Sequence, residues 1–95
     1  ALPEVPILIT ENGIATADDA ERIAYTDGSL HGLAGAIADG ADVRGYLHWS
    51  LLDNFEWFSG YAPRFGLVAV DRTTFARTPK PSLAWLGDIA RRNGL

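Results

Sequence analysis

Short runs of β-forming residues, separated by a longer helical pattern, define the layout of this 95-residue chain. The first apolar run, residues 7–10, is too short for a helix and is followed by the breaker Gly13, so it predicts a buried strand. A second run, residues 43–49, predicts another strand. Because a helical segment lies between them, the two strands are expected to be parallel.

The segment between the strands has the spacing of an amphipathic helix, with apolar residues recurring from Ile23 to Ile37. Thr16 is the expected N-cap, and Gly40 the expected end of the helix. Residues 27–29 (Asp-Gly-Ser) are poor helix formers and predict a break into two pieces.

A long aromatic-rich loop follows the second strand, from Ser50 to about Arg64. Residues 67–70 predict a short extended segment, and residues 79–82 (Pro-Lys-Pro-Ser) open a last helix with an apolar face. The order is therefore β-α-β-loop-α. No repeat or Gly/Ser linker marks a boundary, so we expect a single domain over residues 1–95.

Composition narrows the classes of function. The chain is 47% hydrophobic and 21% charged, as in globular proteins, and its net charge of −4 with scattered basic residues argues against nucleic-acid binding. No apolar run approaches the ~18 residues of a membrane span. The absence of Cys and the distance between His31 and His48 argue against a metal site. The chain begins abruptly, without Met or a signal-like segment, as expected of a fragment. The expected location of the protein is cytoplasmic.

Glu11 is the first candidate for chemistry, because it lies where a buried strand passes into its loop. Catalytic side chains of barrel-type α/β proteins occupy such strand ends. Thr10 and Asn12 flank Glu11 and could hydrogen-bond its carboxylate, which would keep its charge stabilised. The alternative is an acid that merely caps the next turn.

A second cluster follows the other strand and mixes aromatic rings with a carboxylate: Trp49, Glu56, Trp57 and Phe65. Sugar rings stack their apolar faces on aromatic side chains, while their hydroxyl groups need charged or amide acceptors. This mixture suits carbohydrate recognition. The alternative is ordinary aromatic packing, which the residues by themselves favour.

The segments that carry these residues are ITENG (9–13), WSLLDNFEW (49–57), GYAPRFGLVAVD (60–71) and RTPKPSLAW (77–85). Together they resemble the retaining β-glycosidases of glycoside hydrolase family 1, the β-glucosidase family. The resemblance covers nearly the whole chain and implies an α/β fold, the (β/α)8 TIM barrel. A complete barrel needs roughly 200 residues or more. The chain would therefore be its C-terminal quarter: the seventh and eighth strands, each with its following helix.

The resemblance also implies roles for single residues. Glu11 would be the nucleophile, and Trp49 the platform beneath the sugar, with a non-proline cis peptide to Ser50. Glu56 would accept the 4- and 6-hydroxyls, and Trp57 would donate its indole N–H toward the 3-hydroxyl. The wall of the sugar subsite would be formed by Phe65.

Retaining hydrolysis needs a second carboxyl group about 5 Å from the nucleophile, which protonates the leaving oxygen. In the family this group lies in an Asn-Glu-Pro motif, and no such tripeptide occurs in this chain. We therefore expect the chain to be inactive alone and to need the remainder of the barrel as its partner. The expected substrate is an unphosphorylated β-glucoside or oligosaccharide, without cofactor or metal.

Two other readings remain open at this point. A non-catalytic, glycosidase-like carbohydrate-binding protein would keep the aromatic residues and could lose a catalytic carboxylate. A small stand-alone α/β interaction domain would carry these motifs by coincidence. The residues that precede this chain in its gene discriminate among the three, because an Asn-Glu-Pro at a strand end favours the enzyme.

Overall fold

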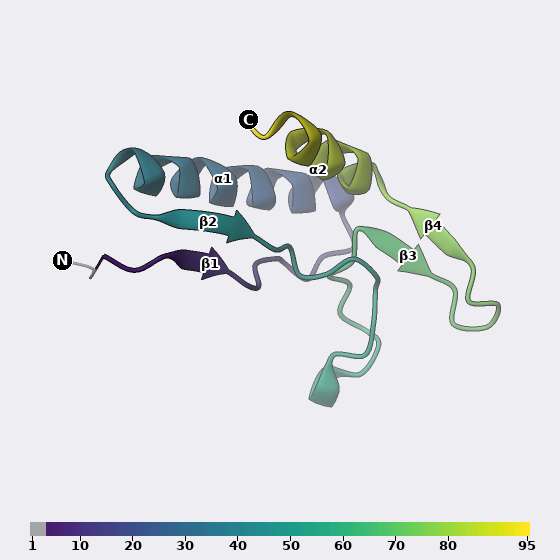
Figure 1. The fold of residues 1–95 in the computed structure, drawn as a ribbon. Helices are drawn as coiled ribbons and strands as arrows, with labels where there is room; N and C mark the ends of the chain where they lie inside the picture. Colours follow the sequence, from purple (N-terminus) through teal and green to yellow (C-terminus); the bar gives the residue numbers. More distant parts are fainter. Residues whose placement is uncertain (1–3) are drawn as a thin grey trace.

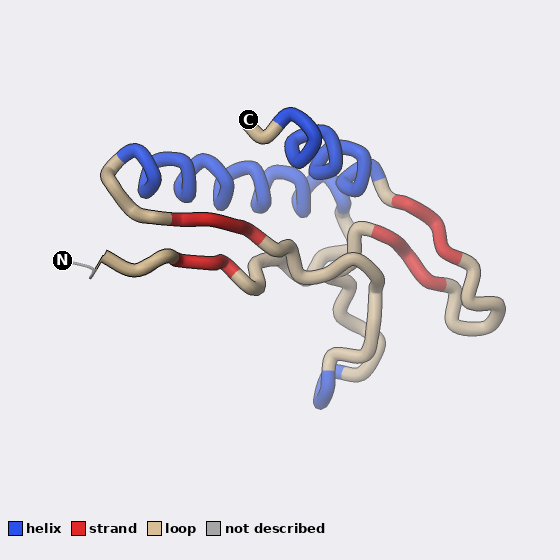
Figure 2. Tube along the Cα trace, in the orientation of Figure 1, coloured by secondary structure: helices blue, strands red, loops and turns tan. Residues whose placement is uncertain are grey.

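A long helix lies along a two-stranded sheet, a shorter helix packs against the long one, and a small hairpin lies beyond the carboxyl ends of the two strands (Figure 1). The structure is a computed structural model and describes residues 4–95. The elements in chain order are β1 (Ile7–Ile9), α1 (Asp19–Ala38), β2 (Val43–Tyr46), the 3₁₀ helix η1 (Trp57–Ser59), β3 (Val68–Val70), β4 (Arg77–Pro79) and α2 (Pro81–Arg92). Loops connect the sheet to η1 and to the hairpin (Figure 2).

The strands β1 and β2 are parallel, with Leu8 opposite Gly45 and Ile9 opposite Tyr46, which confirms the expected strand–helix–strand unit. Both strands are shorter than the apolar runs that predicted them. Backbone pairing continues beyond them, because the N–H of Leu47 donates to the carbonyl of Ile9 at 2.8 Å.

Helix α1 corrects two expectations from the sequence. Its N-cap is Asp18, whose carboxylate accepts from the N–H of Ala20, whereas the hydroxyl of Thr16 accepts from the N–H of Asp18. The helix is also continuous across residues 27–29, because one glycine costs only about 1 kcal/mol in a long helix. Its end is as expected: Gly40 has φ +104° and donates to the carbonyl of Ile37.

The expected extended segment is strand β3, which confirms that prediction, and it pairs antiparallel with β4. The sequence did not indicate β4, whose residues are polar or proline and whose side chains are all exposed. Helix α2 begins at Pro81 and ends at Asn93, which adopts the left-handed conformation of a C-cap.

Few apolar side chains are buried in the described part of the chain. Leu67 and Val68 are the buried hydrophobic residues of residues 4–95, while Leu8 in β1 and Leu47 directly after β2 are each 54% exposed. Parallel sheets normally have both faces covered. The β1–β2 pair is therefore an incomplete layer by itself. Within residues 4–95, neither helix has the length and apolarity to traverse a bilayer.

Candidate active site

The carboxyl ends of β1 and β2 open onto a cavity of about 420 Å³. Its lining comprises Glu11, Asn12, Gly13, Tyr25, Trp49, Glu56 and Phe65. Four of the five site residues expected from the sequence thus meet in one place, although they come from three separate segments. Trp57 is not among the lining residues, and its side chain is 81% exposed on η1.

Backbone contacts place the two strand ends of the site relative to each other. The N–H of Trp49 donates to the carbonyl of Asn12 at 2.8 Å. Gly13 packs so closely that a Cβ there would lie 1.9 Å from the carbonyl oxygen of Trp49. The peptide bond between Trp49 and Ser50 is cis, as the family resemblance implied. Glu11 and Trp49 therefore have a fixed relation that does not depend on side-chain contacts.

The side-chain amide of Asn12 does not make the hydrogen bond to Glu11 that was expected. Its Oδ1 accepts from the hydroxyl of Tyr46 at 2.9 Å, and its Nδ2 lies 3.5 Å from the hydroxyl of Tyr25. The amide thus connects the strand end to β2 and α1, rather than to the carboxylate of Glu11.

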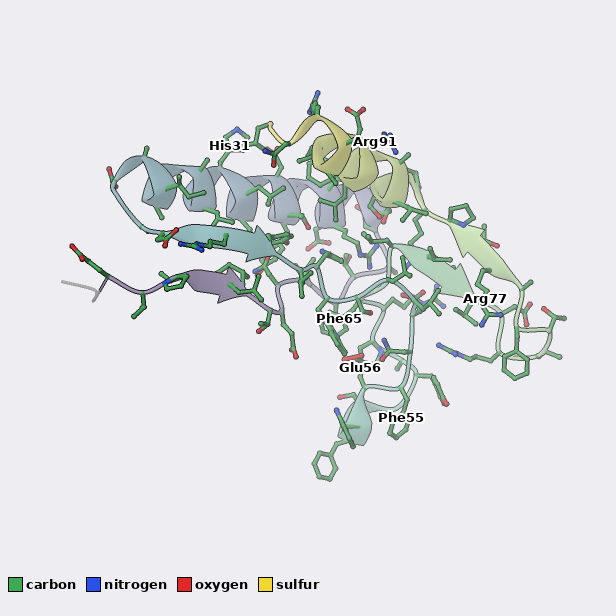
Figure 3. All side chains as sticks on the ribbon, in the orientation of Figure 1. His31, Phe55, Glu56, Phe65, Arg77 and Arg91 are labelled. Carbon is green, nitrogen blue, oxygen red and sulfur yellow. The ribbon has the colours of Figure 1, made fainter. Side chains whose placement is uncertain are left out.

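Glu56 occupies the loop side of the cavity. Its Oε1 accepts from the indole Nε1 of Trp49 at 3.3 Å, whereas its Oε2 is buried without a hydrogen-bond partner in the described residues. Figure 3 shows Glu56 close to Phe65, with Phe55 further out along the same loop. A buried carboxylate oxygen that lacks a donor is costly, so Oε2 is an acceptor whose hydrogen-bonding capacity is unmet within the described residues.

An ion pair beneath the loop was not foreseen. The Asp53 carboxylate accepts from Lys80 Nζ at 2.9 Å and from the N–H of Gly66 at 2.8 Å, and Lys80 also donates to the carbonyl of Gly66 at 2.8 Å. Asp53 and Lys80 are largely buried, with side chains 11% and 15% exposed. This Asp53–Lys80 clamp fixes the start of the loop against the segment that carries Phe65.

A second group of polar contacts joins α1 and α2 to the segment that carries Phe65. Arg22, 1% exposed, donates to Asp19 at 2.7 Å and to the carbonyls of Thr16 and Arg64 at 2.5 Å each. Asp19 accepts from both the N–H and the hydroxyl of Ser82 at the start of α2. Burial raises the pKa of Asp19, but the hydrogen bonds from Ser82 and Arg22 outweigh burial and hold it below its usual value.

His48 contacts the same segment, with Nε2 3.4 Å from the carbonyl of Phe65. Burial, the largest effect, and the charge of Arg22 lower the pKa of His48, against the opposing contact with that carbonyl. The imidazole is therefore neutral at neutral pH. No cluster of three metal-binding side chains occurs among residues 4–95.

Parallel strands joined by a helix, with a cavity at their carboxyl ends, are an arrangement that α/β-barrel proteins share with other α/β proteins. A family model described as "Glycosyl hydrolase family 1" matches residues 2–95. The chain belongs to this family, as the sequence motifs indicated.

Curated relatives extend this result. Thermostable beta-glucosidase B of Thermobispora bispora is 50% identical over 98% of this chain and 21% of its own length. A rice (Oryza sativa subsp. japonica) protein named "Probable inactive beta-glucosidase 14" is also 50% identical, over 92% of this chain and 20% of its own length. The chain thus spans about a fifth of the curated relatives it matches.

Solved structures agree in fold. The apo structure of a beta-glucosidase 1317 matches with a TM-score of 0.92 and 60% identity, over 95% of this chain and 22% of that one. A family 1 b-glucosidase from Thermotoga maritima in complex with isofagomine lactam matches with a TM-score of 0.92 and 41% identity, over 95% of this chain and 23% of that one. The chain therefore has the conformation of part of a family 1 barrel.

Proposed function

We propose that the full-length protein containing this chain is a retaining β-glycosidase that hydrolyses β-glucosides, with Glu11 as its nucleophile. One observation carries the proposal: Glu11 lines the same cavity as Glu56, whose buried Oε2 has no donor in the described residues. A nucleophile and a vacant hydroxyl acceptor beside the indole of Trp49 are what a sugar ring requires. Membership of the family supports this interpretation.

The proposed reaction has two steps. In the first, a Glu11 oxygen attacks the anomeric carbon and forms an ester, while the bond to the leaving oxygen breaks and that oxygen takes a proton from a carboxylic acid outside this chain. In the second, water cleaves the ester, gives its proton to the same carboxyl group and releases the sugar with retained configuration. The chain would form the C-terminal quarter of one (β/α)8 domain, and the rest of the barrel would supply the acid.

The remaining residues would hold the sugar. Glu56 Oε2 would accept the 4- and 6-hydroxyls, and the hydrogen bond from Trp49 Nε1 to Glu56 would fix the orientation of the indole platform. Phe65 would form a wall of the subsite. The proposed hydrogen bond from Trp57 to the 3-hydroxyl rests on the family resemblance alone, because its side chain lies outside the lining of this cavity.

A second candidate is a carbohydrate-binding protein without catalysis. The relative named as a probable inactive beta-glucosidase favours it, because that protein is as similar to this chain as the thermostable beta-glucosidase is. The candidates differ in the acid outside this chain. An Asn-Glu-Pro in the preceding residues of the gene favours the enzyme, and its loss favours the binding protein.

The test is covalent trapping of the full-length protein with an activated 2-deoxy-2-fluoro-glucoside, followed by peptide mapping. The label is expected on Glu11. In parallel, Glu11→Gln should lower kcat by roughly 10⁴-fold or more, because the ester cannot form, whereas Glu4→Gln, at an exposed site before β1, should have no effect. A label on another residue, or full activity of Glu11→Gln, contradicts the proposal.

A further inference from the structure

Asn12 lies directly after Glu11 and is held by groups from two other elements. The hydroxyl of Tyr46 on β2 donates to its Oδ1 at 2.9 Å, and the hydroxyl of Tyr25 on α1 lies 3.5 Å from its Nδ2. The backbone carbonyl of Asn12 accepts from Trp49 at 2.8 Å. The residue next to the proposed nucleophile is thus fixed by both its backbone and its side chain.

The carboxylate of Glu11 has no such support within this chain. Its side chain is exposed, and among residues 4–95 no hydrogen bond to it is formed. Within this chain, the constraint on where this carboxylate can reach is the backbone that carries it, and the contacts of Asn12 hold that backbone in place.

Packing alone does not hold Asn12 in place. A second cavity of about 290 Å³ lies behind it, between the sheet and α1, with Leu33 and Tyr46 in its lining. Burial, and secondarily the neighbouring Tyr25, raise the pKa of Tyr46, so its hydroxyl stays protonated and remains the donor over the working range of pH. The hydrogen bond from Tyr46, the shorter of the two side-chain contacts of Asn12, opposes movement of the amide into this space.

We propose that Asn12 is a positioning residue for Glu11, and that the Tyr46–Asn12 hydrogen bond directs the Glu11 carboxylate toward the anomeric carbon. This inference rests on the proposed function, since it concerns how the nucleophile is aimed. It predicts that the covalent step depends on a hydroxyl group that does not touch the sugar.

The decisive variant is Tyr46→Phe in the full-length protein, which removes one oxygen atom and keeps the ring. With an activated 2-deoxy-2-fluoro-glucoside, the inactivation rate constant at saturation should fall roughly tenfold. The dissociation constant of the inhibitor should stay within twofold, because sugar contacts are unaltered. A residue with a merely structural role would not separate these two constants.

Matched variants sharpen the test. Tyr61→Phe removes another phenolic oxygen, at an exposed ring that packs on Phe55, and should leave both constants unchanged. Asn12→Ala should lower the rate constant at least as much as Tyr46→Phe does. Adding Tyr46→Phe to Asn12→Ala should then cause no further fall, because the two groups act through one hydrogen bond.

Three results would overturn the inference: an unchanged rate constant in Tyr46→Phe, a loss confined to inhibitor affinity, or a full additional loss in the double variant. These are distinct from failure of the proposed function, in which the unaltered protein itself would not be labelled on Glu11. If Tyr46→Phe does not fold, the same constants measured on Asn12→Ala decide the question.

Discussion

The β1–α1–β2 unit carries Glu11, whereas residues 50–82 carry Glu56, and the two regions are ordered by different interactions. In the first region, short parallel strands are joined by backbone hydrogen bonds, and large apolar side chains such as Leu8 and Leu47 remain exposed. In the second, Asp53 and Lys80 are largely buried and pair with each other in the Asp53–Lys80 clamp, whereas Oε2 of Glu56 is buried without a partner in the described residues.

The two parts of the site are therefore held in place by two different kinds of interaction. The region with Glu11 has unfilled apolar faces, so its stability depends on further polypeptide that covers them. The loop region has its polar partners within this chain. Consequently, the position of Glu56 depends chiefly on contacts within this chain, whereas the order of β1 and β2 depends also on further polypeptide that covers their apolar faces.

The largest expected effect concerns the 95-residue chain produced alone. We expect it to aggregate or remain disordered, because β1 and β2 would leave open edges and exposed apolar faces. We also expect no hydrolysis, since the proton donor lies elsewhere. Amide NMR spectra and turnover assays test this: sharp, dispersed signals would contradict the first expectation, and measurable turnover the second.

A smaller but large effect is expected on sugar recognition. Glu56→Ser in the full-length protein should lower kcat/KM for β-glucosides by about a hundredfold, because hydroxyl groups of the bound sugar lose a charged acceptor. Steady-state kinetics measure this, with Glu4→Ser as the control at an exposed glutamate. Unaltered glucoside turnover in Glu56→Ser would refute this role.

The charge of the Glu56 carboxylate also leads to a prediction about which glucosides are preferred as substrates. A 6-phosphate would bring negative charge close to Glu56, and like charges at close range repel by several kcal/mol at an effective dielectric near 20. We therefore expect unphosphorylated glucosides to be better substrates than 6-phosphoglucosides. The reverse preference in a competition assay would show that this reading of the loop is wrong.

The contribution of the Asp53–Lys80 clamp to the stability of the loop region can be tested directly. Lys80→Met should destabilise the full-length protein by about 3 kcal/mol, because it leaves the carboxylate of Asp53 buried without its counter-ion. Arg44→Met breaks a pair with Asp42 that is mostly exposed, and it should cost less than about 1 kcal/mol. Equal losses for the two variants in urea unfolding would show that the clamp adds no special stability.

The smallest effect involves His48, at the junction of the two regions. Its folded pKa lies below that of the unfolded chain, so its contribution to stability is complete above about pH 6.5 and is lost as the pH falls below that value. His48→Gln should remove this part of the pH dependence. Unfolding at pH 7.5 and 5.5 measures it, with the exposed His31→Gln as control; an unchanged pH dependence in His48→Gln would contradict the assignment.

Local patterns were sufficient for the elements whose signals are local. The parallel strands and the end of α1 at Gly40 followed from apolar spacing and a glycine C-cap. The motifs also indicated four residues that line the cavity, but they did not indicate Tyr25, and they included Trp57, which lies outside the lining. The start of α1 was misplaced because Thr16 and Asp18 are both good caps, and only the hydrogen bond to Ala20 selects Asp18.

The polar contacts between residues far apart in the chain could not be predicted from the sequence. Asp53 and Lys80 lie 27 residues apart, and Asp53 alone suggested only a loop-shaping turn. A charged residue within the apolar motif WSLLDNF, with a lysine between two prolines later in the chain, was the available signal. Strand β4 was missed because it is defined by backbone pairing, without any apolar alternation.

A closely packed glycine in each region also limits how this site can be altered by mutation. A side chain at Gly13 would enter the carbonyl of Trp49, and one at Gly66 would enter the backbone at Asp53. Neither neighbour is a flexible side chain that could yield. A substitution library built to change sugar preference would therefore lose nearly every variant at these two positions, and its useful diversity belongs at the side chains that line the cavity.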